Sequence, residues 1–360
     1  MTTTITDVRT SRHTHPLRQP FVTALRTVTS VPVVRVEVIA GDTRGWGEAA
    51  PTPVITGDLA DGIEAALLGP LRDAVVGRDL DDIEHLLRSV ARAVVANTSA
   101  KAALDIALHD ARARDLGLPL YRLLGAGAGD VATDVTVSAG SPQEMAEQAA
   151  LRVAEGFATL KLKVADGRYD DTERVLRVRA AAGPDVALRI DANQGWLPKQ
   201  AVSVITACER ADARIELVEQ PVAAADLAGL AFVTGHVLTA VMADESVAGP
   251  RDALRLAELQ AADLINVKLM KCGGLRPARQ ILDIAAAAGI GVMVGGMMEG
   301  ELAVAAAAAL AATCPAEVVH DLDAAWWLDP AASEKVVSYD GGRLLLADGP
   351  GLGPPPAGAP

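Results

Sequence analysis

From about residue 130 onwards, short runs of apolar and β-branched residues alternate with longer Ala-rich segments whose apolar positions follow a helical period. The short runs have the length of buried strands and lie at Val131–Val137, Thr159–Val164, Ala187–Asp191, Ile215–Glu219, Ala240–Asp244, Asp263–Lys268, Gly291–Val294 and Glu317–Asp321. Their polar ends at residues 163, 191, 219, 244 and 268 are spaced by 28, 28, 25 and 24 residues. This even period predicts a (β/α) barrel. A doubly wound sheet would also alternate strands and helices, but it would seldom keep so even a period, and no GxGxxG follows the first strand.

The pattern is different before residue 130. Residues 31–49 alternate as strands around a turn at Gly41-Asp42, and residues 60–117 carry Ala, Leu and Arg at helical spacing. After Trp327 the chain is rich in Pro and Gly. We therefore expect an α+β domain over residues 1–128, the barrel over 129–326, and a segment over 327–360 that packs back on the first domain.

The composition and net charge exclude some classes of binding partner. Hydrophobic residues make up 50% of the 360 residues and aromatic residues only 3%, so the core must be built from Ala, Val, Leu and Ile. A net charge of −13 repels nucleic acid and anionic membranes, which leaves a small molecule as the expected partner. No signal peptide is visible, the longest apolar run, Leu302–Ala312, is too short to span a bilayer, and three cysteines without a CxxC pair predict no disulfide framework. The cytoplasm is the expected location.

Three consecutive predicted strands end in a carboxylate, at Asp191, Glu219 and Asp244. Because the carboxyl ends of barrel strands meet on one face, these side chains should converge. Each acid could instead cap the helix that follows it. Three buried carboxylates without a cation would, however, repel one another and raise each other's pKa values. The set therefore favours a Mg²⁺ site, because Mg²⁺ prefers oxygen ligands.

Lysines end the strands on either side of these acids. Lys161 and Lys163 share one face of their strand, and Lys268 ends another. A lysine close to a divalent cation in a site of low dielectric constant can lose its proton and act as a general base. Structural salt bridges to the carboxylates are the alternative interpretation.

Two further acids, Asp321 and Asp323, follow the last predicted strand with the same parity. They could complete a second metal site, bind a cationic group such as an ammonium, or belong to an ordinary loop. Spacing alone does not decide among these three.

Taken in order, these motifs resemble the enolase superfamily, in its muconate-lactonising-enzyme subgroup. The resemblance covers nearly the whole chain and rests on Lys161-Leu-Lys163, Asp191-Ala-Asn, Glu219-Gln-Pro, Asp244-Glu-Ser, Lys268-Leu-Met-Lys-Cys-Gly-Gly and Gly45-Trp-Gly-Glu-Ala. It implies a modified (β/α)₇β barrel topped by an N-terminal α+β capping domain, and one Mg²⁺ per subunit held by the three strand-end carboxylates.

Within this subgroup, Asp321-Leu-Asp323 resembles the DxD motif of dipeptide epimerases, in which the two acids bind the α-ammonium of the substrate. Thr23-Ala-Leu-Arg26-Thr is similar to the capping-domain loop of L-Ala-D/L-Glu epimerases, whose Arg binds the glutamate side chain. The resemblance also implies that Thr136 and Lys161 contact the substrate. Gly296 and Gly300 depart from the residues of many relatives, so they could change the pocket.

The function that this resemblance implies is epimerisation at the α-carbon of the C-terminal residue of a dipeptide, with L-Ala-D/L-Glu as the expected substrate pair. One of Lys163 and Lys268 would remove the proton to form an enediolate, and the other would return it on the opposite face. The alternatives are an N-succinylamino-acid racemase or o-succinylbenzoate synthase, a muconate cycloisomerase, and an inactive barrel that serves as a binding protein. A homo-oligomer is expected.

Overall fold

The N-terminal part of the chain forms an antiparallel sheet of three strands in the order β1 (Ile5–Val22), β2 (Thr27–Ala40) and β3 (Thr43–Ala49). The computed structural model describes residues 3–23 and 27–356. The expected strands at 31–49 are present as β2 and β3, whereas β1 was not predicted. Strand β1 is at the edge of the sheet and exposes one face, so its sequence is polar with isolated buried residues such as Ile5, Val8 and Phe21.

Helices cover this sheet and turn the chain towards the barrel. They are α1 (Ala60–Ala66), the π-helical turn η1 (Leu67–Leu71), α2 (Ile83–Ala93), α3 (Thr98–Asp115) and α4 (Leu120–Leu123). Helix α3 packs directly on β3 because two glycines of the strand leave room for its backbone. A Cβ on Gly45 would lie 2.2 Å from the carbonyl oxygen of Ala107, and one on Gly47 would lie 2.1 Å from that of Ala103. The Gly-Trp-Gly motif is therefore required for packing the capping domain.

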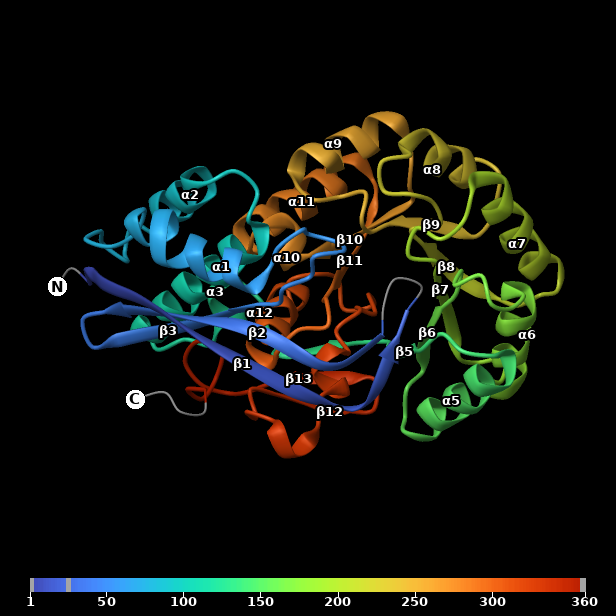
Figure 1. Cartoon of the computed structure of the whole chain (residues 1–360), viewed down its shortest axis with the longest axis horizontal. Helices are drawn as coiled ribbons and strands as arrows, with labels where there is room; N and C mark the ends of the chain where they lie inside the picture. Colours follow the sequence, from blue (N-terminus) through green and yellow to red (C-terminus); the bar gives the residue numbers. More distant parts are fainter. Residues whose placement is uncertain (1–2, 24–26, 357–360) are drawn as a thin grey trace.

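The second part of the chain is the expected (β/α) barrel. Its parallel sheet has seven strands in the order β11-β10-β9-β8-β7-β6-β5, and helices curve around its outside (Figure 1). The strands are β5 (Val135–Val137), β6 (Thr159–Lys163), β7 (Ala187–Asp191), β8 (Ile215–Glu219), β9 (Ala240–Ala243), β10 (Leu264–Lys268) and β11 (Gly291–Gly295). The helices are α5 (Pro142–Ala154), α6 (Asp171–Ala182), α7 (Pro198–Arg210), α8 (Leu227–Thr234), α9 (Pro250–Leu259), α10 (Leu269–Cys272), α11 (Leu275–Ala288) and α12 (Glu301–Ala311). The fold is a modified (β/α)₇β barrel with an N-terminal α+β domain.

Two of the eight expected strands differ from the structure. The run Val131–Val137 divides into β4 (Asp130–Ala132), which pairs with the C-terminal strand β13 (Arg343–Leu346), and β5, which belongs to the barrel. The run Glu317–Asp321 is not a regular strand. It forms only the isolated bridges Thr133 to His320 and Gly295 to Asp321, which lie between the two ends of the parallel sheet. A single hydrogen-bonded residue on each side is enough to close the barrel there but too short to count as a strand.

The C-terminal segment connects both parts. It contains η2 (Ala324–Trp327), η3 (Pro330–Ala332) and a hairpin of β12 (Val337–Asp340) with β13. Beyond the hairpin, Gly351 accepts a hydrogen bond from the backbone N–H of Leu120 at 2.7 Å, and the N–H of Leu352 donates to Asp110 of α3 at 2.6 Å. These hydrogen bonds join the segment to helices α3 and α4.

The apolar run Leu302–Ala312 forms most of α12, in which every residue is buried in the core. In the part of the chain that the structure describes, we find no helix with the length and hydrophobicity needed to cross a bilayer.

Candidate active site

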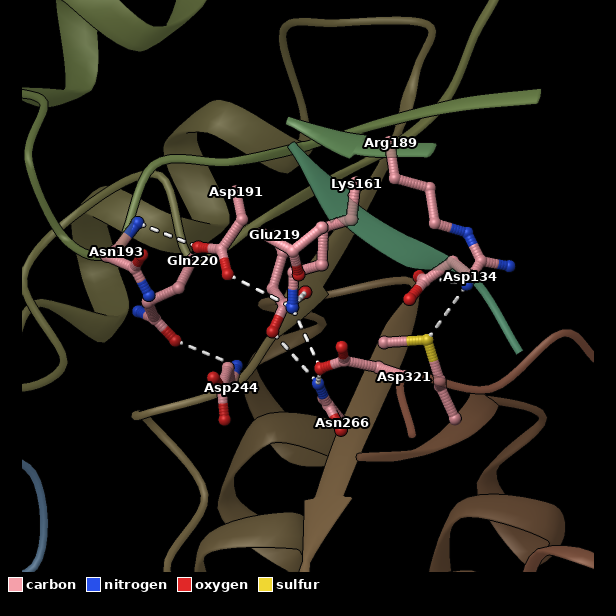
Figure 2. Close-up of polar contacts among 12 residues, drawn as sticks. Asp134, Lys161, Arg189, Asp191, Asn193, Glu219, Gln220, Asp244, Asn266 and Asp321 are labelled. Carbon is pink, nitrogen blue, oxygen red and sulfur yellow. Dashed lines mark hydrogen bonds and ion pairs between the residues drawn. The ribbon is translucent and has the colours of Figure 1, made fainter. Parts of the chain in front are cut away.

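The predicted strand-end residues converge at the carboxyl end of the barrel (Figure 2). Asp191 and Glu219 are the last residues of β7 and β8, and Asp244 directly follows β9. The lysines come from the flanking strands, with Lys161 and Lys163 on β6 and Lys268 at the end of β10. All six side chains are buried, because parallel strands bring their carboxyl ends to one face and the inward-facing side chains meet there.

Lysine ammonium groups lie between the carboxylates. The Nζ of Lys163 is 2.6 Å from Oδ2 of Asp191, and the Nζ of Lys268 is 2.8 Å from Oδ2 of Asp244. The Nζ of Lys161 is 2.7 Å from Oε2 of Glu219. The ammonium groups thus separate the carboxylates. Within residues 3–23 and 27–356, no three His, Cys, Asp or Glu side chains are arranged so that they could hold one metal ion.

The charges of the site nevertheless fit a divalent cation. Buried carboxyl groups outnumber buried lysines here; the carboxyl groups are Asp191, Glu219, Asp244, Glu299, Asp321 and Asp323, and the lysines are Lys161, Lys163, Lys268 and Lys271. Burial, reinforced by the charge of Asp191, raises the pKa of Glu219 to about 8, and burial raises that of Glu299 to about 8. The three strand-end acids are hard-oxygen donors, so they suit Mg²⁺.

The pKa values of Lys161 and Lys268 depend on the charges of the same carboxylates. Burial alone would lower the pKa of Lys268. The negative charge of Asp244 is the main opposing effect, and the pKa lies above its usual value. The pKa of Lys161 is raised well above its usual value as well, by Asp321, Glu219 and Asp191, again against the effect of burial. Lys161 and Lys268 therefore stay cationic as long as these carboxylates are charged and no other cation compensates them.

Asp244 is held in place by two residues that the sequence analysis did not identify. The amide oxygen of Gln220 accepts a hydrogen bond from the backbone N–H of Asp244 at 2.9 Å (Figure 2). The same oxygen accepts one from the backbone N–H of Ser246 at 3.1 Å. The ammonium of buried Lys271 donates to Oδ1 and to the backbone oxygen of Asp244. Lys271 lies in the short helix α10 (Leu269–Cys272), three positions after Lys268 at the end of β10. A second lysine so soon after a strand-end lysine was a signal that could have identified it.

Asn266 was also missed, and it connects the carboxylate at the end of β8 with that of Asp321. Its Nδ2 donates to Oε1 of Glu219 at 2.9 Å and to Oδ2 of Asp321 at 3.3 Å (Figure 2). Asn266 has the same parity on β10 as Lys268, so the alternation of side chains along the strand could have placed it in the site.

The two acids of the Asp-Leu-Asp motif have different surroundings. Burial opposes ionisation of Asp321, but Lys161 at 2.9 Å, together with Lys268, lowers its pKa below the usual value. Asp323 accepts hydrogen bonds at Oδ2 from the backbone N–H of Thr136 at 2.7 Å and from Nε1 of Trp327 at 2.9 Å. Within the described ranges, no Lys, Arg or His forms an ion pair with Asp323. Burial, followed by the charge of Asp321, raises the pKa of Asp323.

One pocket brings these groups together. The predicted residues Thr136, Lys163, Asp244, Lys268, Asp321 and Asp323 line it, together with Asn193, Gly296 and the side chains of Phe21, Thr23, Val54, Ile55, Met297 and Met298. Lys161, Asp191 and Glu219 are buried in contact with the lining residues and are not part of the pocket surface themselves. The predicted Arg26 lies outside the described residues. The pocket therefore combines lysines, acids and an apolar wall.

Comparison with known families assigns both parts of the chain. Residues 5–125 match the family model of the mandelate racemase / muconate lactonizing enzyme N-terminal domain. Residues 144–356 match the model of the enolase C-terminal domain-like family.

Individual relatives are similar over nearly their full length. The L-Ala-D/L-Glu epimerase of Bacillus subtilis is 45% identical over 349 residues, which cover 96% of this chain and 95% of the relative. The hydrophobic dipeptide epimerase of Enterococcus faecalis is 42% identical, covering 94% and 95%. A solved structure of dipeptide epimerase from Enterococcus faecalis V583, complexed with Mg and the dipeptide L-Leu-L-Tyr, superposes with a TM-score of 0.92 at 40% identity and covers 98% of this chain and 99% of that one.

Proposed function

The chain belongs to the enolase superfamily, in its mandelate racemase and muconate lactonizing enzyme branch, and we propose that within this family it is a Mg²⁺-dependent dipeptide epimerase. The reaction would invert the α-carbon of the C-terminal residue of the dipeptide. We propose further that the preferred substrate is the L-Ala-D/L-Glu pair. This chain is similar to epimerases that act on dipeptides, and its own pocket contains the groups that such a substrate needs.

This proposal rests mainly on one pocket that contains both the acid Asp323 and the bases Lys163 and Lys268. Asp323 is a buried carboxylate without an ion pair among the described residues, and a buried charge is costly unless a cation meets it. The ammonium of a dipeptide would supply that cation. Lys163 and Lys268 line the same pocket and would lie beside the other end of the substrate. An N-succinylated substrate has no ammonium, so the racemase and synthase alternatives do not account for Asp323.

The positions of the two lysines suit proton transfer on two faces of one carbon. Lys163 is on β6 and Lys268 ends β10, and the three strands between them, β7 to β9, lead to the acids Asp191, Glu219 and Asp244. We infer that Asp191, Glu219 and Asp244 would hold Mg²⁺, which supplies positive charge against the negative charge that develops on the substrate carboxylate. Lys161 would add a second positive charge near that carboxylate.

In the forward direction, one lysine in its neutral form takes the α-proton, and the C–H electron pair moves towards the substrate carboxylate. The opposite lysine, as an ammonium, then donates its proton to the other face of the same carbon. The reverse reaction exchanges the two roles, so each lysine must be able to act as acid and as base. Thr136 contacts Asp323 through its backbone N–H and would help to hold the N-terminal part of the substrate.

A dipeptide panel tests the proposed function. In D₂O with Mg²⁺, free L-Ala-L-Glu is expected to gain one deuterium at the Glu α-carbon and to form L-Ala-D-Glu, measured by mass spectrometry and chiral separation. The N-acetylated dipeptide is the matched control, and we expect it to react at least about tenfold more slowly because it cannot make the charged hydrogen bond to the acid pair. Bound Mg²⁺ without deuterium uptake from any dipeptide would favour the binding-protein alternative, and a preference for N-succinyl amino acids would favour the racemase alternative.

A second substrate class has specific support. The wall of the pocket includes the apolar side chains of Val54, Ile55, Met297 and Met298, which would also suit a dipeptide with an apolar C-terminal residue. The similarity to a hydrophobic dipeptide epimerase agrees with this second candidate. The two substrate classes differ in whether a cation meets the side chain of the C-terminal residue, and we propose that Arg26 is that cation.

Arg26→Ala separates the two classes. The protein carries a net charge of −13, so its overall field does not attract an acidic substrate, and specificity for Glu needs a local positive charge. We expect the substitution to lower kcat/KM for L-Ala-L-Glu by roughly thirtyfold, about 2 kcal/mol, because an Arg pairs with a carboxylate by charged hydrogen bonds. L-Ala-L-Leu should be nearly unaffected. An equal loss for both dipeptides, or a wild-type preference for L-Ala-L-Leu, would reject the Glu assignment and leave the general epimerase proposal in place.

Two further features remain predictions. We propose that the protein acts in the cytoplasm, since its partners are small soluble molecules and its charge disfavours anionic membranes. We also propose that it forms a homo-oligomer, which light scattering would determine.

A further inference from the structure

Trp327 is the least exposed of the large side chains around the acid pair. It ends the short helix η2, four residues after Asp323, and its relative exposure is 0%. Its indole Nε1–H donates to Oδ2 of Asp323 at 2.9 Å, and the same oxygen accepts the backbone N–H of Thr136 at 2.7 Å. The Thr136 side chain is hydrogen-bonded to this carboxylate as well. Among the residues that the structure describes, the hydrogen-bond donors to Asp323 are thus uncharged.

Aromatic contacts fix the Trp327 ring. Phe21 packs edge-on against it with the ring centroids 5.1 Å apart and an interplanar angle of 82°. Trp326 packs on it at 5.4 Å and 87°. Phe21 belongs to β1 of the capping domain and also lines the pocket. The indole is therefore held by both parts of the molecule, and it cannot rotate without disturbing them.

The rigidity of this ring matters for Asp323. A carboxylate rotates easily about its last torsion, and only hydrogen bonds determine where its oxygens point. Binding of an ammonium depends on direction as well as charge, so an acid with a fixed orientation loses less conformational freedom when the substrate arrives. Thr136 fixes one side of Oδ2 from β5, and Trp327 fixes the other from η2.

We propose that Trp327 is a positioning residue that holds Asp323 in the orientation that binds the substrate ammonium. This inference rests on the proposed function, because it concerns recognition of a free dipeptide. Trp327 touches neither the substrate nor the lysines in this scheme. It acts through Asp323, and its effect should therefore be confined to substrates that carry an ammonium.

The test compares Trp327→Phe with the matched control Trp196→Phe. Phenylalanine keeps an aromatic ring at position 327 but removes the Nε1–H donor. Trp196 is another buried tryptophan whose indole Nε1–H donates to a carboxylate, that of Asp171 at 2.9 Å, and it does not line the pocket. We expect Trp327→Phe to raise KM for L-Ala-L-Glu about tenfold with kcat changed less than about twofold, the size of one lost hydrogen bond to a charged group. For the N-acetylated dipeptide, KM should not change. Trp196→Phe should leave the ratio between the two substrates at the wild-type value.

A double-mutant cycle with Asp323→Asn makes the assignment sharper. If Trp327 acts through Asp323, adding Trp327→Phe to Asp323→Asn should raise KM by less than about twofold, because the interaction is already lost. An equal loss for free and acetylated substrates, or a full tenfold effect in the Asp323→Asn background, would overturn the inference and indicate a general packing role. If Trp327→Phe fails to fold, benzothienylalanine at position 327, which replaces the N–H by sulfur in a ring of the same shape, should give the same KM effect, and an unchanged KM would overturn the inference. A wild-type protein that epimerises no dipeptide would instead reject the proposed function.

Discussion

Replacing Lys268 by alanine is expected to reduce epimerisation of L-Ala-L-Glu and of L-Ala-D-Glu together, by about 10²- to 10⁴-fold, the range measured for loss of a general acid or base. The ammonium of Lys268 lies 2.8 Å from Asp244 and lines the pocket opposite the strand that carries Lys163. Inversion needs one group to remove the proton and a second to replace it on the other face. Removing either group should therefore stop both directions.

Isotope exchange distinguishes this loss from a general failure of the site. In D₂O the Lys268→Ala variant should still exchange the α-proton of one stereoisomer without inverting it, because Lys163 remains on the other face. Lys163→Ala should show the same behaviour with the other stereoisomer. Lys199→Ala, at an exposed position of α7, is the matched control and should keep wild-type rates. The two-base mechanism is wrong if Lys268→Ala epimerises as fast as the unmodified enzyme.

Removal of the divalent cation should have an effect at least as large. After dialysis against EDTA, epimerisation of L-Ala-L-Glu is expected to fall to the background rate, and addition of Mg²⁺ should restore it. The site assembles more buried carboxylates than lysines, and Asp244 and its neighbours keep the pKa of Lys268 above its usual value. Without the cation, the developing charge on the substrate is not stabilised and Lys268 does not readily become neutral.

Substitution of one metal-binding acid provides the control for chelation. Asp244→Asn should raise the Mg²⁺ concentration needed for half-maximal activity, whereas Asp226→Asn should not, because Asp226 caps helix α8 through the N–H of Gly229 at 2.8 Å and is not a strand-end acid of the site. Circular dichroism would show whether both variants remain folded. Full activity after exhaustive chelation would contradict the assignment of Asp191, Glu219 and Asp244 as metal ligands.

The strand ends of the barrel could be predicted because two signals agree there. A buried parallel strand is a short apolar run, and a charged residue that ends it must lie at the carboxyl face of the sheet. The runs ending at Asp191 and Glu219 are reproduced as β7 and β8 residue for residue. The grouping of Lys163, Lys268 and Asp244 around one pocket follows from the same rule.

Other features depend on contacts between segments far apart in sequence, which periodicity does not reveal. Strand β1 exposes one face, so its apolar residues are too sparse to be recognised. The run Glu317–Asp321 has the composition of a strand, but the residues around it allow it only one bridge on each side. Gln220, Asn266 and Lys271 are single polar residues. They matter because their side chains are hydrogen-bonded to residues of the site, and the sequence does not show those partners. The indole of Trp327 reaches Asp323 only because η2 folds back one turn.

The return of residues 343–352 to the end of the capping domain has a consequence for how the protein is made. Strand β13 pairs with β4, and Gly351 and Leu352 bind the backbone of Leu120 and the carboxylate of Asp110. The ribosome makes residues 343–352 after every candidate site residue, so the capping domain and the outer edge of the barrel stay incomplete until those residues have emerged. Domains usually fold as they emerge, whereas here the capping domain has to wait for residues 343–352. A messenger that stops shortly after Asp323 would thus encode all the chemistry of the site and lack the piece that ties both halves of the molecule together.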